Sequence, residues 1–119
     1  MSGPKPSFHP SPSKPKLRLP KGSCDSHVHV FGPASVFPYA KDAPFVPADA
    51  SREALFAMHA LLGVEHCVIV QSTCHGFDNS VVADALKAKQ GTYCGIALAP
   101  VSVDDGELKR LDGLGFRGL

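Results

Sequence analysis

The stretch Arg52–Gln71, REALFAMHALLGVEHCVIVQ, places a helical pattern directly before a strand pattern. Its apolar residues recur at helical spacing and predict one buried helix face: Leu55, Met58 and Leu62. Asp49 or Ser51 can cap this helix, and Gly63 can end it. The final run His66–Gln71 is short and nearly all apolar, which is typical of strands covered on both faces in a parallel sheet. This stretch therefore predicts an α/β fold.

The same alternation continues on both sides of this stretch. Asn79 and Asp104 can each cap a further helix, and a long loop with five prolines or glycines occupies 32–50. The expected inner faces of these two helices are Val82, Ala85, Leu86 and Lys89 in the first and Leu108, Leu111 and Leu114 in the second. Three further strands are predicted: 24–31, 93–99 and one that begins at Phe116.

The resulting order, β-α-β-α-β-α-β, corresponds to about three and a half βα units of a (β/α)₈ TIM barrel. In this interpretation the residues form the N-terminal part of the barrel, and the barrel is not closed within them. A sheet covered by helices on one face only should leave apolar strand residues partly exposed to water: Val68, Val70, Ile96 and Leu98.

Charge and proline content separate residues 1–21 from residues 22–119 of this 119-residue chain. The first segment has five lysines or arginines, no acidic residue and six of the 11 prolines, so it carries +5 and the remainder −4. It predicts a solvated Pro-rich tail, without the apolar core of a signal peptide, before one barrel-like domain. The domain has no basic stripe and no membrane-length apolar run, so we expect a cytoplasmic protein with neither nucleic-acid nor membrane partners.

His27 and His29 are the strongest functional signal. Residues two apart in a strand point to the same face, here close to the strand's C-terminal end, where α/β barrels carry their active sites. Such a pair can ligate a divalent metal or bind a substrate carbonyl, although histidines at this spacing can also be purely structural. We expect no direct catalytic role for Asp25.

Residues 25–33, Asp-Ser-His-Val-His-Val-Phe-Gly-Pro, resemble the opening D-x-H-x-H-x-F-G-P of the amidohydrolase-2 group of the amidohydrolase superfamily. Further matching stretches follow in order: Phe37-Pro38, Asp49-Ala50, Val68–Gln71, Cys74–Gly76, Asp78-Asn79, Gly95–Ala97 and Gly115–Gly118. Within that group, the segment Val-Gln-x-x-Cys-His-Gly-x-Asp-Asn is most similar to the 2-pyrone-4,6-dicarboxylate lactonases of lignin-derived aromatic catabolism.

This resemblance implies a hydrolase that opens a small dicarboxylated pyrone lactone without a metal or other cofactor. His27 and His29 would polarise the lactone carbonyl or line the pocket, and Thr73 would donate to a substrate carboxylate. Phe45 stands where the family often has Tyr, so one phenol hydrogen bond to substrate would be lost. The resemblance also implies an Asp general base, a further His and several arginines, which are assigned to no position of this sequence.

Other interpretations stay open at this point. His75 follows the second strand at the catalytic end and can bind either substrate or loop backbone. In a metal-dependent decarboxylase or lactonase of the superfamily, His27 and His29 would bind Zn²⁺ or Mn²⁺. A non-catalytic α/β module or an inactive fragment is the third possibility, and we expect the 119 residues on their own to be inactive.

Overall fold

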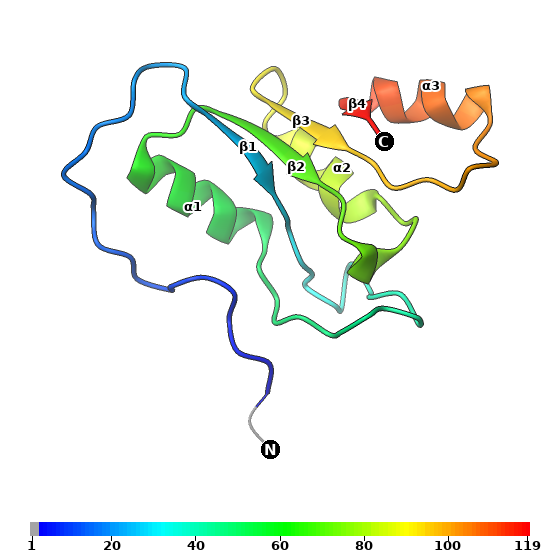
Figure 1. Cartoon of the computed structure of the whole chain (residues 1–119), viewed down its shortest axis with the longest axis horizontal. Coiled ribbons are helices and arrows are strands. Elements are labelled where there is room, and N and C mark those ends of the chain that lie inside the picture. Colours follow the sequence, from blue (N-terminus) through cyan, green and yellow to red (C-terminus); the bar gives the residue numbers. More distant parts are fainter. Residues whose placement is uncertain (1–2) are drawn as a thin grey trace.

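The structure, a computed structural model, describes residues 3–119 and consists of a parallel sheet covered by helices. The strand order is β1-β2-β3-β4, so each strand pairs with the next along the chain. In these residues the elements are β1 (Cys24–Val28), α1 (Arg52–Leu62), β2 (His66–Val70), the 3₁₀ turn η1 (Thr73–His75), α2 (Ser80–Ala88), β3 (Tyr93–Ile96), α3 (Asp105–Gly113) and β4 (Phe116–Gly118). The predicted α/β order is confirmed (Figure 1).

Helix α1 begins and ends where the sequence predicts. Of the two candidate caps, Ser51 is the one used, and its side chain accepts a hydrogen bond from the backbone N–H of Ala54. Gly63 ends the helix in the left-handed conformation that glycine adopts without steric cost. The buried residues of the helix are Leu55 and His59, so its inner face includes a polar side chain that the apolar pattern did not predict.

Helix α2 shows a different use of its predicted cap. Asn79 precedes the helix but makes no side-chain cap bond. The carboxylate of Asp78 takes that place, accepting from the backbone N–H of Ser80. The side chain of Asn79 bonds the backbone of Leu98 instead.

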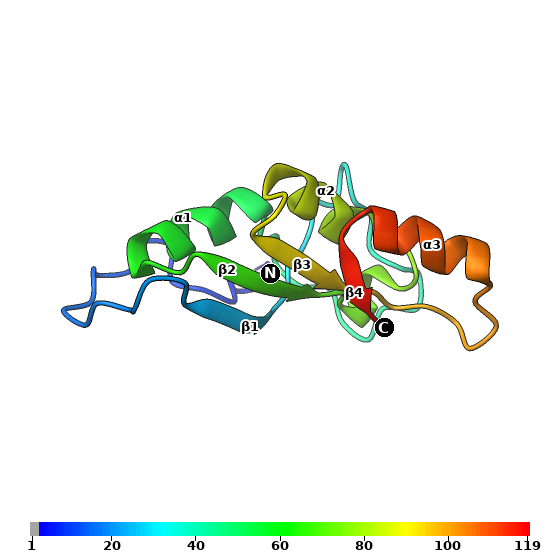
Figure 2. The ribbon, with the colours of Figure 1, turned by 90° about the horizontal axis from the view of Figure 1, so that it is seen from above.

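The predicted inner face of helix α3 is partly wrong. Asp104 caps the helix through the backbone N–H of Glu107, as predicted. Leu111 is buried, but Leu108 and Leu114 are 38% and 40% exposed. Helix α3 lies at the edge of the sheet beside β4 (Figure 2), and a helix at an edge buries a narrower stripe than one between two neighbours.

All three helices lie on one face of the sheet (Figure 2). The hydrophobic core consists of buried residues of the helices and of the strands packed against them. Gly95 of β3 leaves room there for the side chains of Phe116 and Leu86, which would be 2.7 Å and 2.9 Å from an added Cβ. The opposite face carries the partly exposed apolar residues that the sequence predicts: Val68, Val70, Ile96 and Leu98.

Residues 3–22 contain no helix or strand and are almost entirely exposed. They pass around α1 before the chain enters β1 (Figure 1), and Lys14–Leu19 line an open recess together with residues 60–63 at the end of that helix. The boundary near residue 22 stays a prediction. None of the helices in residues 3–119 combines the length and the apolar character that crossing a bilayer requires.

Candidate active site at the C-terminal ends of the strands

Strand β1 contains a bulge between Asp25 and Val28, so the bulged segment includes His27. Asp25 pairs with Cys67 and Val28 with Ile69, so β1 uses three residues where β2 uses two. Simple alternation would place Asp25 on the same face as His27 and His29. Because the bulge adds one residue, Asp25 instead contacts helix α1 through His59, and Val28 packs against the core.

His27 and His29 therefore lie on the face opposite to Val28, and both are exposed. Their ring centroids are 5.3 Å apart, with the rings nearly perpendicular. The structure thus brings the two predicted residues together at the end of the strand, beyond the last residue of β1 in the case of His29. Their catalytic role stays a prediction.

The ring of His29 is oriented by the neighbouring strand. Its Nδ1 lies 2.8 Å from the backbone oxygen of Val70. A carbonyl oxygen can only accept, so Nδ1 carries the proton and donates. In the neutral ring Nε2 is then an unprotonated acceptor, able to take a proton or bind a metal. The neutral ring of His29 cannot donate from Nε2 to a substrate carbonyl. The predicted role of polarising the lactone carbonyl therefore requires a protonated ring.

Thr73 and His75 belong to η1, the turn that follows β2. The turn is held by Ser72, whose hydroxyl accepts from the backbone N–H of Cys74. Thr73 is exposed and lines a recess together with Tyr39, Lys41 and other loop residues. This position leaves its hydroxyl free for a ligand.

His75 is only 3% exposed, and backbone groups engage both of its ring nitrogens. The backbone N–H of Gly32 donates to Nε2, so Nδ1 carries the proton and donates to the backbone oxygen of Pro38. The ring therefore joins η1 to the long loop 32–50. Substrate contact by its nitrogens would require one of these bonds to break, and the predicted substrate role remains without structural support.

Phe45 is 58% exposed and lies outside the residues that line the recess around Thr73. Tyr39 occupies that recess instead, with its ring centroid 4.7 Å from that of His75. Its hydroxyl donates to Asp49, and burial together with this carboxylate raises the pKa of Tyr39. The sequence analysis missed Tyr39, because a lone Tyr in a long loop gives no signal of its place.

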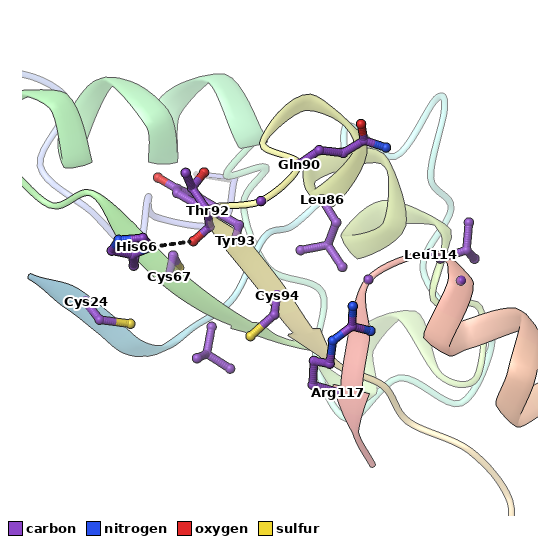
Figure 3. Close-up of a pocket in the computed structure, with 14 residues that line it drawn as sticks. Cys24, His66, Cys67, Leu86, Gln90, Thr92, Tyr93, Cys94, Leu114 and Arg117 are labelled. Atoms are coloured by element: carbon purple, nitrogen blue, oxygen red, sulfur yellow. Dashed lines mark hydrogen bonds between the residues drawn. The ribbon is translucent and has the colours of Figure 1, made fainter. Parts of the chain in front are cut away.

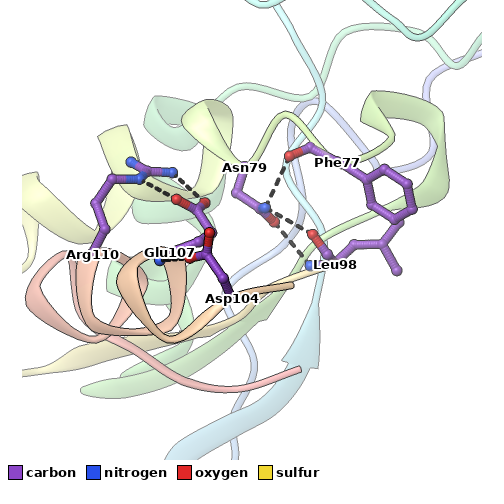
Figure 4. A network of polar contacts seen from close by, with 6 residues as sticks. All are labelled: Phe77, Asn79, Leu98, Asp104, Glu107 and Arg110. Carbon is purple, nitrogen blue, oxygen red and sulfur yellow. Dashed lines mark hydrogen bonds and ion pairs between the residues drawn. The ribbon is translucent and has the colours of Figure 1, made fainter. Parts of the chain in front are cut away.

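Two buried amides hold the loops behind the site, and the sequence analysis missed both roles. Gln71 donates from Nε2 to the backbone oxygens of Gly76 and Asp78, while its Oε1 has no hydrogen-bond partner among residues 3–119. Asn79 bonds both backbone groups of Leu98, just beyond β3 (Figure 4). Polar residues that end an apolar strand or precede a helix could have signalled such anchors.

A second recess lies at the other end of the strands and does not serve the histidine pair. It is lined by Cys24, His66, Cys94 and Arg117, among others, and His66 donates to the backbone oxygen of Thr92 (Figure 3). Cys67, also in this lining, is buried, and burial raises the pKa of its thiol to about 12. Barrel enzymes use this N-terminal end of the strands for stability, so we assign it no catalytic role.

The same end of β1 offers side chains that can bind a metal. His27 and His29 offer two imidazoles, as tetrahedral zinc sites commonly require. Within the part of the chain that the structure describes, no group of three or more His, Cys, Asp or Glu side chains gathers to hold a metal. The described residues thus fit a metal only as two members of a larger ligand set.

Residues 24–119 match the amidohydrolase family, and the chain belongs to that family. Among curated relatives, the 2-pyrone-4,6-dicarboxylate hydrolase of Comamonas testosteroni is 43% identical over 112 residues, which cover 94% of this chain and 37% of the relative. The 4-sulfomuconolactone hydrolase of Rhizobium radiobacter is 41% identical over 101 residues, covering 85% of this chain and 34% of that protein. The chain therefore spans about a third of the length of the curated relatives it matches.

A solved structure shows the same fold. It is the crystal structure, with citric acid bound, of an Acinetobacter baumannii protein described as a probable 2-pyrone-4,6-dicarboxylic acid hydrolase. The TM-score is 0.75 at 23% sequence identity, over 82% of this chain and 36% of that one. The four-stranded parallel sheet agrees with the expected part of a (β/α)₈ barrel.

Proposed function

We propose that the protein hydrolyses a lactone that carries acidic groups, with 2-pyrone-4,6-dicarboxylate as the expected substrate. Two curated relatives are named as hydrolases of 2-pyrone-4,6-dicarboxylate and of 4-sulfomuconolactone, and both compounds are lactones with acidic substituents. The observation that carries the proposal is the exposed pair His27 and His29 at the end of β1, with Nε2 of His29 free. A small-molecule partner and a cytoplasmic location belong to the same proposal.

Lactone hydrolysis needs stabilisation of the negative charge that develops on the carbonyl oxygen when water attacks. The neutral ring of His27 can donate to that oxygen from one of its nitrogens. His29 can donate from Nε2 only when it is protonated, because its Nδ1–H is already committed to Val70. The metal-free form of the proposal therefore requires His29 to act as an imidazolium, or to accept a proton from water.

The metal-dependent alternative is favoured by one observation. A ring fixed through Nδ1–H to a backbone carbonyl, as His29 is, presents Nε2 as many metal-binding histidines do. His27 and His29 would then be two ligands of Zn²⁺ or Mn²⁺, and the lactone carbonyl would be polarised by the cation. The metal-free form stays the first proposal, and an assay with and without a chelator decides between the two forms.

The acidic groups of the substrate need donors. Thr73 is exposed, and Lys41 lines the same recess, so the two can supply a hydroxyl and a positive charge to one carboxylate. Such a contact exists in both the ground state and the transition state. We therefore expect Thr73→Val to raise KM and to leave kcat nearly unchanged.

The test follows the loss of pyrone absorbance with protein expressed from its complete coding sequence. His29→Ala should lower kcat by about 10²-fold or more, whether His29 donates to the developing oxyanion as an imidazolium or takes a proton from the attacking water. His66→Ala is the matched control, since His66 lies at the opposite end of the neighbouring strand and should leave kcat unchanged.

The same assay is run with and without a chelator. Activity that survives chelation supports the metal-free form, whereas activity abolished by the chelator and restored by Zn²⁺ makes His27 and His29 ligands. If the pyrone is untouched under both conditions, the proposed substrate is wrong.

A further inference from the structure

A buried polar chain joins three elements directly behind the histidine pair. His59 of α1 is 1% exposed, and its Nε2 lies 3.0 Å from Oδ2 of Asp25 in β1. Its Nδ1 lies 2.7 Å from the hydroxyl of Tyr93 in β3. The second carboxylate oxygen of Asp25 accepts from the backbone N–H of His27 at 3.3 Å. The chain therefore runs from the core to the backbone of a proposed catalytic residue.

The chemistry of the partners fixes where each proton lies. The Asp25 carboxylate can only accept, so Nε2 of His59 carries a proton and donates it. In the neutral ring Nδ1 is then an acceptor, and the Tyr93 hydroxyl donates to it. Burial raises the pKa of Tyr93 to about 12, so the hydroxyl keeps the proton that it donates. For the neutral ring, this arrangement satisfies both nitrogens of His59.

The place where Asp25 acts is the bulge of β1. One carboxylate oxygen of Asp25 bonds His59 of α1. The other accepts from the backbone N–H of His27, which lies in the bulged segment. We propose that Asp25, anchored by His59 and Tyr93, is a positioning residue that fixes this bulge and so turns His27 and His29 to the open face. The orientation of His27 and His29 by Asp25 does not depend on the proposed function, and only the expected effect on turnover rests on it.

If this polar cluster only stabilised the core, substitutions in it would have a different pattern of effects. Asp25→Asn has almost the same shape but only one oxygen, so its amide either keeps that oxygen on the His27 N–H and presents an N–H₂ group to His59, or flips and loses the His27 N–H. The ring of His59 can accept the N–H₂ donor only if its proton moves from Nε2 to Nδ1, where it would donate to the Tyr93 oxygen. Asp25→Ala removes both bonds. Asp84→Ala is the matched control, because Asp84 also pairs with a residue of α1, Arg52, but this pair joins α1 to α2 and not to β1.

The experiment uses protein expressed from its complete coding sequence and labelled with ¹⁵N in its histidines. Ring nitrogen shifts, assigned to His59 with a His59→Gln variant, should show the Nε2–H form in wild type and the Nδ1–H form in Asp25→Asn. Hydrogen exchange at the His27 amide should be faster in Asp25→Ala and unchanged in Asp84→Ala. An unchanged tautomer together with an unchanged His27 amide in Asp25→Asn, or an unchanged His27 amide in Asp25→Ala, would overturn the inference.

Turnover gives the third measurement. Asp25→Ala should lower kcat by about 10²-fold with a small change in KM, as a displacement of about 1 Å at a catalytic group can. Asp25→Asn should keep most of the activity. If the variants change the tautomer and the amide as stated but the pyrone is not hydrolysed even by wild type, the positioning role holds and the proposed function fails. Equal losses of kcat in Asp25→Ala and Asp84→Ala would count against positioning.

Discussion

Asn79 offers a sharp test of the structure, because sequence and structure assign it different roles. The sequence predicts a helix cap, a position at which Asp serves as well as Asn. In the structure Asn79 is 7% exposed, and its side chain bonds backbone groups outside the helix (Figure 4). Its Nδ2 donates to the backbone oxygens of Leu98 and Phe77, and its Oδ1 accepts from the N–H of Leu98.

The expected cost of replacing Asn79 follows from these bonds. Each neutral hydrogen bond contributes about 1 kcal/mol, and a buried backbone group left unpaired costs about 1–3 kcal/mol. Asn79→Ala removes three bonds and frees both backbone groups of Leu98, which is partly buried, so we expect the free energy of unfolding to fall by about 3 kcal/mol. Asn79→Asp should cost at least as much at neutral pH, since a carboxylate oxygen would then face two carbonyl oxygens.

The assay is urea unfolding followed by circular dichroism, with protein expressed from its complete coding sequence. Asp78→Ala is the control, because it removes the exposed carboxylate that caps α2 and should cost about 0.5–2 kcal/mol. A cap role for Asn79 predicts that Asn79→Asp is tolerated. If Asn79→Asp is as stable as wild type, the bridging role is refuted and the sequence-based prediction is restored.

Three further predictions concern packing, completeness and pH. Gly95→Ala should destabilise the protein by about 1–3 kcal/mol in urea unfolding, because the new methyl group would collide with Phe116 and Leu86; Gly113→Ala, which meets no atom within 4 Å, should be neutral or stabilising. Residues 1–119 expressed alone should show no cooperative transition in calorimetry and no turnover, since one face of the sheet exposes apolar side chains; a sharp transition would contradict this. Hydrogen bonds from Ser80 lower the pKa of Asp78, so their stabilisation is present above the carboxyl's unfolded value and is lost as pH falls through its lower folded value. Ser80→Ala should therefore be less stable than wild type at pH 7 in urea unfolding, and the two should converge in acid; a difference that persists in acid would exclude this cause.

The sequence by itself predicted the parts of this protein that depend on local pattern. Helical spacing and cap residues at Ser51, Gly63 and Asp104 placed the helices, because these signals act within a few residues of the chain. The apolar run after α1 predicted a parallel sheet. The spacing of His27 and His29 predicted two imidazoles on one face, and the structure places the two rings side by side at the end of β1, while their role stays a prediction.

Tertiary structure alone decided the features that depend on partners distant in sequence. The bulge of β1 arises from pairing with β2, so no pattern within residues 24–31 revealed which face Asp25 occupies. The proton on His29 is placed by Val70, the ring of His75 is occupied by Gly32 and Pro38, and Asn79 leaves its helix for Leu98. A polar side chain bonds whichever group the fold brings within about 3 Å of it, and the sequence states which groups a side chain offers but not which ones it meets.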